Sequence, residues 1–192
     1  MAGRLVLIRH GETAWSLSGQ HTGTTDIALT DTGRRQAEAL AAKLAGRVWA
    51  EVRTSPMLRA RTTAELARLG GAAVDSDLTE WDYGSVEGRT TADLRRTVPG
   101  WSIWRDGPPG GETVGQVGTR ARSLLAGVAP AVETGGDVAL VGHGHMFRIL
   151  AATWLGLPAD AGRLFALDPA SISVLGHERE QRVIESWNDA VE

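Results

Sequence analysis

The chain has 192 residues, 42% of them hydrophobic, which is enough for one domain with a buried core. Its formal net charge of −3 and its scattered basic residues give no electrostatic argument for nucleic acid or a membrane surface as a partner. Without cysteine, it forms neither a disulfide nor a thiolate metal site. No apolar run has the length of a transmembrane helix or the features of a signal peptide, so a cytoplasmic location is the default expectation.

The first predicted element is a buried strand that ends on reactive residues. Residues 5–8, Leu-Val-Leu-Ile, form a continuous apolar run that is typical of a parallel strand covered on both faces. Arg9 and His10 follow at the carboxyl end of this strand, where open α/β sheets bind ligands. Arginine offers a charged fork of donors that matches phosphate, and a neutral imidazole can be a nucleophile near neutral pH. The pair suggests phosphoryl transfer to His10.

Helices and strands alternate along the rest of the chain. Apolar spacing predicts helices over 31–45, from Ser55-Pro56 onward, over 113–133 and over about 147–155. Further strands are predicted over 48–54, 72–75 and 137–141, with two edge strands over 171–175 and 183–186. This alternation implies a single α/β domain over residues 1–192, in three layers, with helices on both faces of a mostly parallel sheet. The segment of about 77–112 is expected to be an insertion over the strand ends that forms a substrate wall.

A second histidine, His143, also ends a predicted apolar strand. Two histidines that end strands of one sheet can converge on one pocket, so we expect His143 near His10. His143 and His145 also form an H-x-H pair, which can bind a metal ion. Further ligands at a recognisable spacing are missing, so no metal site and no cofactor are expected. His145 is expected beside the site or at the start of the following helix.

Five motifs, in order along the chain, carry a family resemblance: RLVLIRHGETAW at 4–15, GQHTGTTDIALTDTGRRQA at 19–37, SPMLRARTTA at 55–64, LTEWDYGSVEG at 78–88 and VGHGH at 141–145. Together they resemble the histidine phosphatase superfamily, also called phosphoglycerate mutase-like, from residue 4 to about 150. The resemblance implies a metal-independent enzyme that forms a phosphohistidine at His10 and takes a small phosphomonoester as substrate.

The same resemblance implies roles for the catalytic residues. Arg9 and Arg59 would hold phosphoryl oxygens, and the pattern S-x-x-x-R-A-x-x-T-A selects Arg59 over Arg61, which lies on nearly the opposite face of the same helix. His143 matches the second histidine of the family, which donates to phosphoryl oxygens and stabilises the transition state. Arginines and histidines are suited to this role because charge spreads over the oxygens during phosphoryl transfer.

A leaving alkoxide also needs a proton, which a carboxyl group of raised pKa can supply. Glu80 in L-x-E-x-x-Y-G-x-x-E-G matches the acidic residue with that role in many family members. Asp82 and Glu87 are the local alternatives, although the E-G pair that contains Glu87 resembles an element that fixes a loop.

The expected substrate-binding residues come from several loops. Thr22 and Gly23 would supply a hydroxyl and a backbone N–H that approaches phosphate closely, because glycine has no side chain. Ser16 stands where many family members have asparagine, and serine is shorter with fewer donors. Arg105 would bind a second phosphate or a sugar hydroxyl. The complete expected set is Ser16, His21, Thr22, Gly23, Tyr83, Trp104, Arg105 and Gly144.

Hydrolysis is favoured over mutase chemistry. About sixty residues separate Glu80 from His143, whereas family mutases of the cofactor-dependent type have a longer insertion here. The subsequence WSIWRDGPPGGET at 101–113 resembles acid phosphatase-like and sedoheptulose-1,7-bisphosphatase-like members, with Trp101 and Trp104 as either core or substrate-wall residues. The sequence therefore predicts a phosphomonoesterase for small phosphorylated metabolites. Mutase-type transfer and a non-catalytic phospholigand-binding module are the alternatives, and the oligomeric state, a homo-oligomer included, stays open.

Overall fold

The strands that the apolar runs predict form one six-stranded sheet in the order β3-β2-β4-β1-β5-β6. Its strands are β1 (Leu5–Arg9), β2 (Trp49–Thr54), β3 (Ala73–Val74), β4 (Asp137–Gly142), β5 (Ser171–Glu178) and β6 (Gln181–Ala190). The first four are parallel, and β5 and β6 are antiparallel to their neighbours. The expected mostly parallel sheet is confirmed by this computed structural model, which describes residues 2–191.

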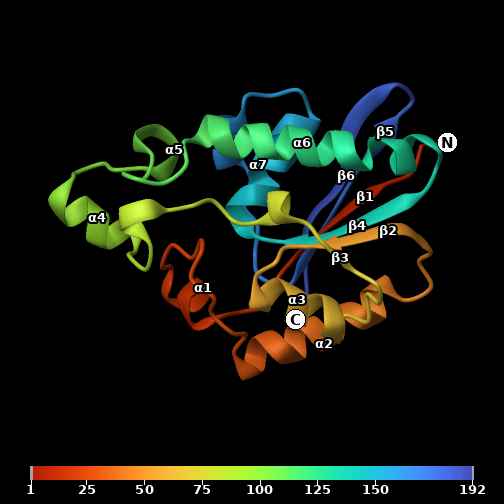
Figure 1. Ribbon diagram of the computed structural model, residues 1–192, viewed down its shortest axis with the longest axis horizontal. Coiled ribbons are helices and arrows are strands. Elements are labelled where there is room, and N and C mark those ends of the chain that lie inside the picture. Colours follow the sequence, from red (N-terminus) through yellow and green to blue (C-terminus); the bar gives the residue numbers. More distant parts are fainter. Residues whose placement is uncertain (1, 192) are drawn as a thin grey trace.

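Helices cover both faces of this sheet (Figure 1). They are α1 (Ala14–Ser18), α2 (Asp31–Leu44), α3 (Leu58–Leu66), α4 (Thr91–Thr97), α5 (Ile103–Asp106), α6 (Val114–Glu133) and α7 (Gly144–Trp154), with short 3-10 helices at η1 (Ser76–Leu78), η2 (Gly84–Val86) and η3 (Ala159–Leu164). Within residues 2–191, none of the helices combines the length and hydropathy that a membrane crossing requires.

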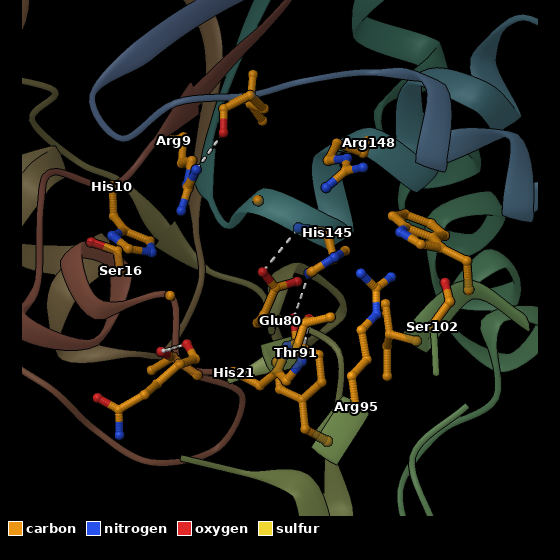
Figure 2. Close-up of a pocket in the computed structure, with 18 residues that line it drawn as sticks. Arg9, His10, Ser16, His21, Glu80, Thr91, Arg95, Ser102, His145 and Arg148 are labelled. Atoms are coloured by element: carbon orange, nitrogen blue, oxygen red, sulfur yellow. Dashed lines mark hydrogen bonds between the residues drawn. The ribbon is translucent and has the colours of Figure 1, made fainter. Parts of the chain in front are cut away.

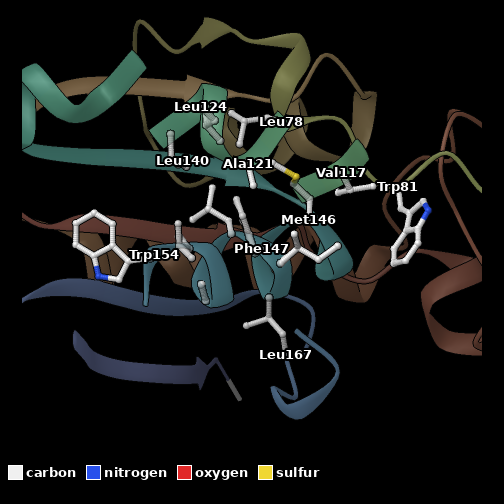
Figure 3. Packing of buried hydrophobic residues seen from close by; sticks show 14 of the residues in the cluster. Leu78, Trp81, Val117, Ala121, Leu124, Leu140, Met146, Phe147, Trp154 and Leu167 are labelled. Carbon is white, nitrogen blue, oxygen red and sulfur yellow. The ribbon is translucent and has the colours of Figure 1, made fainter. Parts of the chain in front are cut away.

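Alternation along β1 explains why its sequence is apolar throughout. Leu5 and Leu7 belong to the hydrophobic cluster that α6 and α7 cover, which Figure 3 shows, whereas Val6 and Ile8 belong to the cluster under α2 and α3. Successive side chains of a strand point to opposite faces, so a strand buried on both faces needs an apolar residue at every position. The carboxyl ends of β1 and β4 are thereby anchored in two cores.

Two expected details are wrong. The helix after β2 begins at Leu58 rather than at Ser55-Pro56, and its first N–H, that of Leu58, donates to Asp26 Oδ1 at 2.8 Å. The Ser55 hydroxyl accepts from the Met57 N–H at 3.3 Å, just before the helix, and also contacts His143 Nε2 at 2.7 Å. The strand over 171–175 is not at an edge, because β5 pairs with β1 on one side and with β6 on the other, so β6 alone is an edge in this half of the sheet.

The segment of about 77–112 lies beyond the end of the sheet that is opposite the N-terminus (Figure 1). It contains α4 and α5 joined by loops. A capping box begins α4, since Thr90 and Asp93 each bind the backbone N–H of the other. This segment is placed where it can form one wall of a site at the carboxyl ends of the parallel strands.

Candidate active site

Strand pairing brings two histidines together. Arg9, the last residue of β1, is paired with Gly142, the last residue of β4. His10 and His143 follow these two residues, and their ring centroids lie 5.2 Å apart in an edge-to-face arrangement. Both side chains are buried.

The ring of His10 is held in one tautomer. Its Nδ1 lies 2.7 Å from the Gly11 carbonyl oxygen, and because a carbonyl only accepts, Nδ1 carries the hydrogen. Nε2 therefore keeps a free lone pair. Burial, together with the positive charges of Arg9 and Arg59, lowers the pKa of His10 well below its ordinary value of 6.5. The ring is neutral at neutral pH, as a nucleophile must be.

His143 has both ring nitrogens engaged. Arg59 Nε donates to His143 Nδ1 at 3.2 Å, which leaves the ring hydrogen on Nε2. That nitrogen donates to the Ser55 hydroxyl at 2.7 Å. Burial, followed by the positive charge of Arg59, lowers the pKa of His143 well below 6.5. His143 is therefore a neutral N–H donor.

Arg59 is fully buried and lies behind the cavity wall. Besides His143, it donates to the carbonyl oxygens of Thr22, Gly23 and Thr25 at 3.0–3.1 Å. These bonds fix the loop that follows α1. Arg61, the alternative on the same helix, is exposed.

The Gly23 N–H, which is expected to approach phosphate, has another partner in this structure. Gly23 does not line the cavity, and its N–H donates to both carboxylate oxygens of Glu87 at 2.9 and 3.0 Å. A Cβ at this position would lie 2.5 Å from the Trp81 carbonyl oxygen. Glycine is needed here for close backbone packing, and Glu87, which also accepts from Thr25 N–H, fixes the loop.

The Glu80 carboxylate sits at the N-terminus of α7. Its Oε1 accepts from the backbone N–H of Trp81 and Met146 at 3.0 and 2.8 Å, and its Oε2 accepts from that of His145 at 2.9 Å. The side chain is only 6% exposed, and it reaches the cavity. Because Oε2 accepts a single N–H, it keeps a lone pair for a ligand.

A cavity of about 400 Å³ opens at these strand ends (Figure 2). This volume suits a small metabolite. The expected residues that line it are Arg9, His10, Ser16, His21, Thr22, Glu80, Tyr83, Trp104 and Gly144. The cavity is also lined by His145, which was expected beside the site or at the start of the following helix. Polar lining residues that the sequence analysis did not assign are Gln20, Thr91, Arg95, Ser102 and Arg148.

Arg9 and Gly144 meet at the floor of the cavity. Arg9 Nη1 donates to the Leu167 carbonyl oxygen, and within residues 2–191 Arg9 Nε has no partner. A Cβ on Gly144 would approach the guanidinium carbon of Arg9 to 3.3 Å. The glycine therefore leaves room for this guanidinium beside the N-terminus of α7, where anions bind readily.

Aromatic and imidazole rings form another part of the wall. The Tyr83 hydroxyl is 2.6 Å from His145 Nδ1, and His21 lies 4.8 Å from the Tyr83 ring between centroids. Burial lowers the pKa of His21 to about 4. Trp104 lines the cavity, whereas Trp101 belongs to the hydrophobic core, so the two tryptophans divide between the expected alternatives.

Ser16 and Arg105 are the remaining residues that are expected to bind substrate. The Ser16 hydroxyl already takes part in the capping box that begins α1, where it donates to the Thr13 carbonyl and accepts from the Thr13 N–H. Arg105 is also expected to bind substrate, and the structure places it elsewhere. Its guanidinium is exposed, bonded to Asp106 and to the Gly100 carbonyl, and outside the cavity.

Within residues 2–191, no group of three or more histidine, cysteine or acidic residues is arranged to hold a metal ion. The H-x-H pair has other partners, since His143 contacts Arg59 and Ser55 while His145 contacts Tyr83.

Comparison with known proteins agrees with this arrangement. The family model of the histidine phosphatase superfamily (branch 1) matches residues 5–190. An acid phosphatase of Mycobacterium tuberculosis is 47% identical over 93% of this chain and 89% of its own length. A sedoheptulose 1,7-bisphosphatase of Saccharomyces cerevisiae is 36% identical over 80% of this chain and 68% of its own. The solved structure of a Mycobacterium tuberculosis open reading frame superposes with a TM-score of 0.92, at 44% identity and 98% coverage of both chains. This chain is an enzyme that belongs to the histidine phosphatase superfamily.

Proposed function

We propose that this enzyme hydrolyses phosphomonoesters of small metabolites through a phosphohistidine at Nε2 of His10. The observation that carries the proposal is the tautomer of His10. Its Nδ1–H is bonded to the Gly11 carbonyl, its Nε2 has no hydrogen-bond partner within residues 2–191, and its pKa is lowered by burial and by two arginines. A buried imidazole with a free lone pair in a cavity lined by arginine is suited to attack on phosphorus.

The reaction proceeds in two transfers. Nε2 of His10 attacks phosphorus, the bond between phosphorus and the ester oxygen breaks, and its electron pair leaves with that oxygen, which takes up a proton. Water then attacks phosphorus, the nitrogen–phosphorus bond breaks, and inorganic phosphate leaves. The protein supplies position and charge, which is the main requirement of phosphoryl transfer.

Arg9 and His143 are proposed to stabilise the phosphoryl oxygens. Arg9 lines the cavity beside His10 and has an unpartnered Nε within residues 2–191. His143 would redirect its Nε2–H from the Ser55 hydroxyl to a phosphoryl oxygen. Arg59 would act through its bond to His143, which keeps the hydrogen on Nε2. Each fixed donor of this kind is worth a large factor in rate.

Glu80 is proposed to carry the proton. It would protonate the leaving oxygen in the first transfer and accept a proton from the attacking water in the second. Its position supports this role, because its side chain lines the same cavity as His10 and its Oε2 accepts a single backbone N–H.

Trapping the intermediate tests the proposal. The enzyme is mixed with a phosphomonoester carrying labelled phosphorus, quenched in alkali, and digested for mass spectrometry. We expect acid-labile label on His10 and none in His10→Ala. A wild-type enzyme that releases phosphate without ever carrying label would contradict the mechanism. Label that passes to a phosphoglycerate acceptor rather than to water would support mutase-type transfer instead.

A further inference from the structure

Two arginines lie across the cavity from His10. Figure 2 shows Arg95 and Arg148 on the side away from His10 and Arg9, with both guanidinium groups directed toward the space beside His145. They come from different parts of the chain, since Arg95 is on α4 in the inserted segment and Arg148 is on α7. Neither takes part in the proposed phosphoryl transfer.

The Arg95 guanidinium is hydrogen-bonded through Nε, whereas its two terminal nitrogens are available to a ligand. Its Nε donates to the Trp101 carbonyl oxygen at 2.9 Å, which fixes the direction of the guanidinium. Within residues 2–191, no hydrogen bond or ion pair engages its terminal nitrogens. A fixed guanidinium with free terminal N–H groups presents the pair of donors that a phosphate or carboxylate accepts.

Arg148 is held more firmly. Its Nε donates to the Gly162 carbonyl oxygen at 3.1 Å, and its Nη2 donates to the Arg163 carbonyl oxygen at 3.3 Å. Its guanidinium carbon lies 4.7 Å from the centroid of the Trp104 ring, which it covers. These contacts fix the direction of the guanidinium, and no acidic side chain of residues 2–191 forms an ion pair with it.

The charge of this cavity is unbalanced. Arg96 and Arg105, neighbours in the same inserted segment, are paired with Asp93 and Asp106. In contrast, no ion pair within residues 2–191 involves any of the three arginines that line the cavity, Arg9, Arg95 and Arg148. Glu80 is the one acidic residue among the described lining residues, and backbone N–H groups occupy it. A single phosphoryl group bound beside Arg9 would leave the positive charges of Arg95 and Arg148 without a negative partner.

We infer that the far side of the cavity binds a second anionic group of the substrate, a phosphate or a carboxylate, and that Arg95 and Arg148 determine this specificity. The inference rests on the proposed reaction at His10. The substrate is then a small phosphomonoester that carries a second anionic group. Arg95 and Arg148 take the place that sequence reasoning gave to Arg105.

Matched substrate pairs test the inference. One pair is 3-phosphoglycerate and glycerol 3-phosphate, which differ by a carboxylate in place of a hydroxymethyl group. The other pair is a hexose 1,6-bisphosphate and the corresponding hexose 6-phosphate. We expect kcat/KM to be at least about tenfold higher for the doubly anionic member of one pair, which identifies the second group as carboxylate or phosphate.

Variants then assign the preference to residues. Arg95→Gln and Arg148→Lys should each reduce the wild-type preference within the favoured pair by about tenfold, mainly through KM, because they weaken a contact present in both ground and transition states. Arg96→Gln, one residue from Arg95 on the same helix and paired outside the cavity, is the matched control and should keep the preference. Lysine rather than glutamine is used at Arg148 because it keeps the positive charge beside Trp104 and so favours a folded variant.

The outcomes separate this inference from the proposed function. Equal kcat/KM within both pairs, or equal effects of Arg95→Gln and Arg96→Gln, would overturn the second-anion site while phosphate release from p-nitrophenyl phosphate upheld the reaction. Absence of phosphate release from every one of these esters would overturn the proposed reaction and the inference together. A preference that both Arg95→Gln and Arg148→Lys reduce supports the site.

Discussion

His10 and His143 occupy corresponding places at the ends of neighbouring parallel strands, yet different partners hold their rings. The Gly11 carbonyl oxygen takes the Nδ1–H of His10 and leaves Nε2 with a lone pair in the cavity. The Arg59 guanidinium occupies Nδ1 of His143, so Nε2 of that ring carries a hydrogen. The first partner is an acceptor and the second is a donor.

This difference separates the roles of two residues of one type. An imidazole whose Nδ1 meets an acceptor is a nucleophile at Nε2, and an imidazole whose Nδ1 meets a donor is an N–H donor at Nε2. Burial lowers the pKa of both rings, so neither role depends on a charged imidazole. The comparison leads to four predictions, which follow from the largest expected effect to the smallest.

Removing the nucleophile should have the largest effect. His10→Ala should reduce phosphate release by on the order of 10⁴-fold or more, because no other group attacks phosphorus. His10→Gln should be as inactive, since an amide is not a nucleophile. Circular dichroism checks that both variants fold. A purified His10→Ala with near-wild-type turnover would contradict the role of His10.

Replacing His143, the proposed N–H donor, should lower the rate less than replacing His10, and a side chain that keeps an N–H should restore part of the rate. His143→Ala should lower kcat by about 10²–10³-fold, the usual loss for one donor to developing charge. Unlike His10→Gln, His143→Gln should recover part of the rate, because an amide N–H can still donate. The intermediate should still form on His10 in both variants. Failure of His143→Gln to exceed His143→Ala would show that the N–H is not the property that matters.

Glu80→Gln tests whether the proton comes from a third group rather than from either histidine. We expect a loss of about 10²-fold or more with alkyl phosphates, whose leaving oxygen needs a proton. Hydrolysis of p-nitrophenyl phosphate should fall much less, because its leaving group departs without one. Equal losses for both kinds of ester would remove Glu80 as the acid.

The smallest effect concerns pH. Since burial and nearby arginines hold the pKa of both histidines below 6.5, lowering the pH from 8 to 6.5 should leave both rings neutral. Protonation, and with it loss of the nucleophile, should come only at lower pH. NMR titration of the ring carbons, assigned through His10→Ala and His143→Ala, measures this directly. A titration midpoint at or above pH 6.5 for either ring would contradict the conclusion that burial and nearby arginines lower its pKa.

The strand ends could be predicted because buried parallel strands leave a clear mark in the sequence. Leu5–Ile8 and Val138–Val141 are continuous apolar runs, so the residues that follow them are placed at one edge of the sheet. The opposed tautomers of His10 and His143 could not be predicted, because they depend on Gly11 and on Arg59, which lies 84 residues from His143.

The two arginines on the far side of the cavity, Arg95 and Arg148, could not be assigned to the site from the sequence as the strand ends could. Arg105 was an attractive choice, but the adjacent Asp106 binds its guanidinium. Arg148 left a signal in the sequence, since it lies three residues after His145 in the same helix and such residues share a face. Arg95 left none, because its place depends on how the inserted segment folds and on the Trp101 carbonyl that holds its stem.

The position of β5 between β1 and β6 makes residues 167–190 part of the catalytic unit. Without this hairpin, β1 would lose the partner of its outer side, and the strand that carries the nucleophile would expose unpaired backbone groups open to aggregation. The loop that leads into β5 also brings the Leu167 carbonyl to Arg9. Shortening the chain from its carboxyl end is therefore a poor route to a smaller catalyst, whereas joining another protein to that end leaves β1 covered.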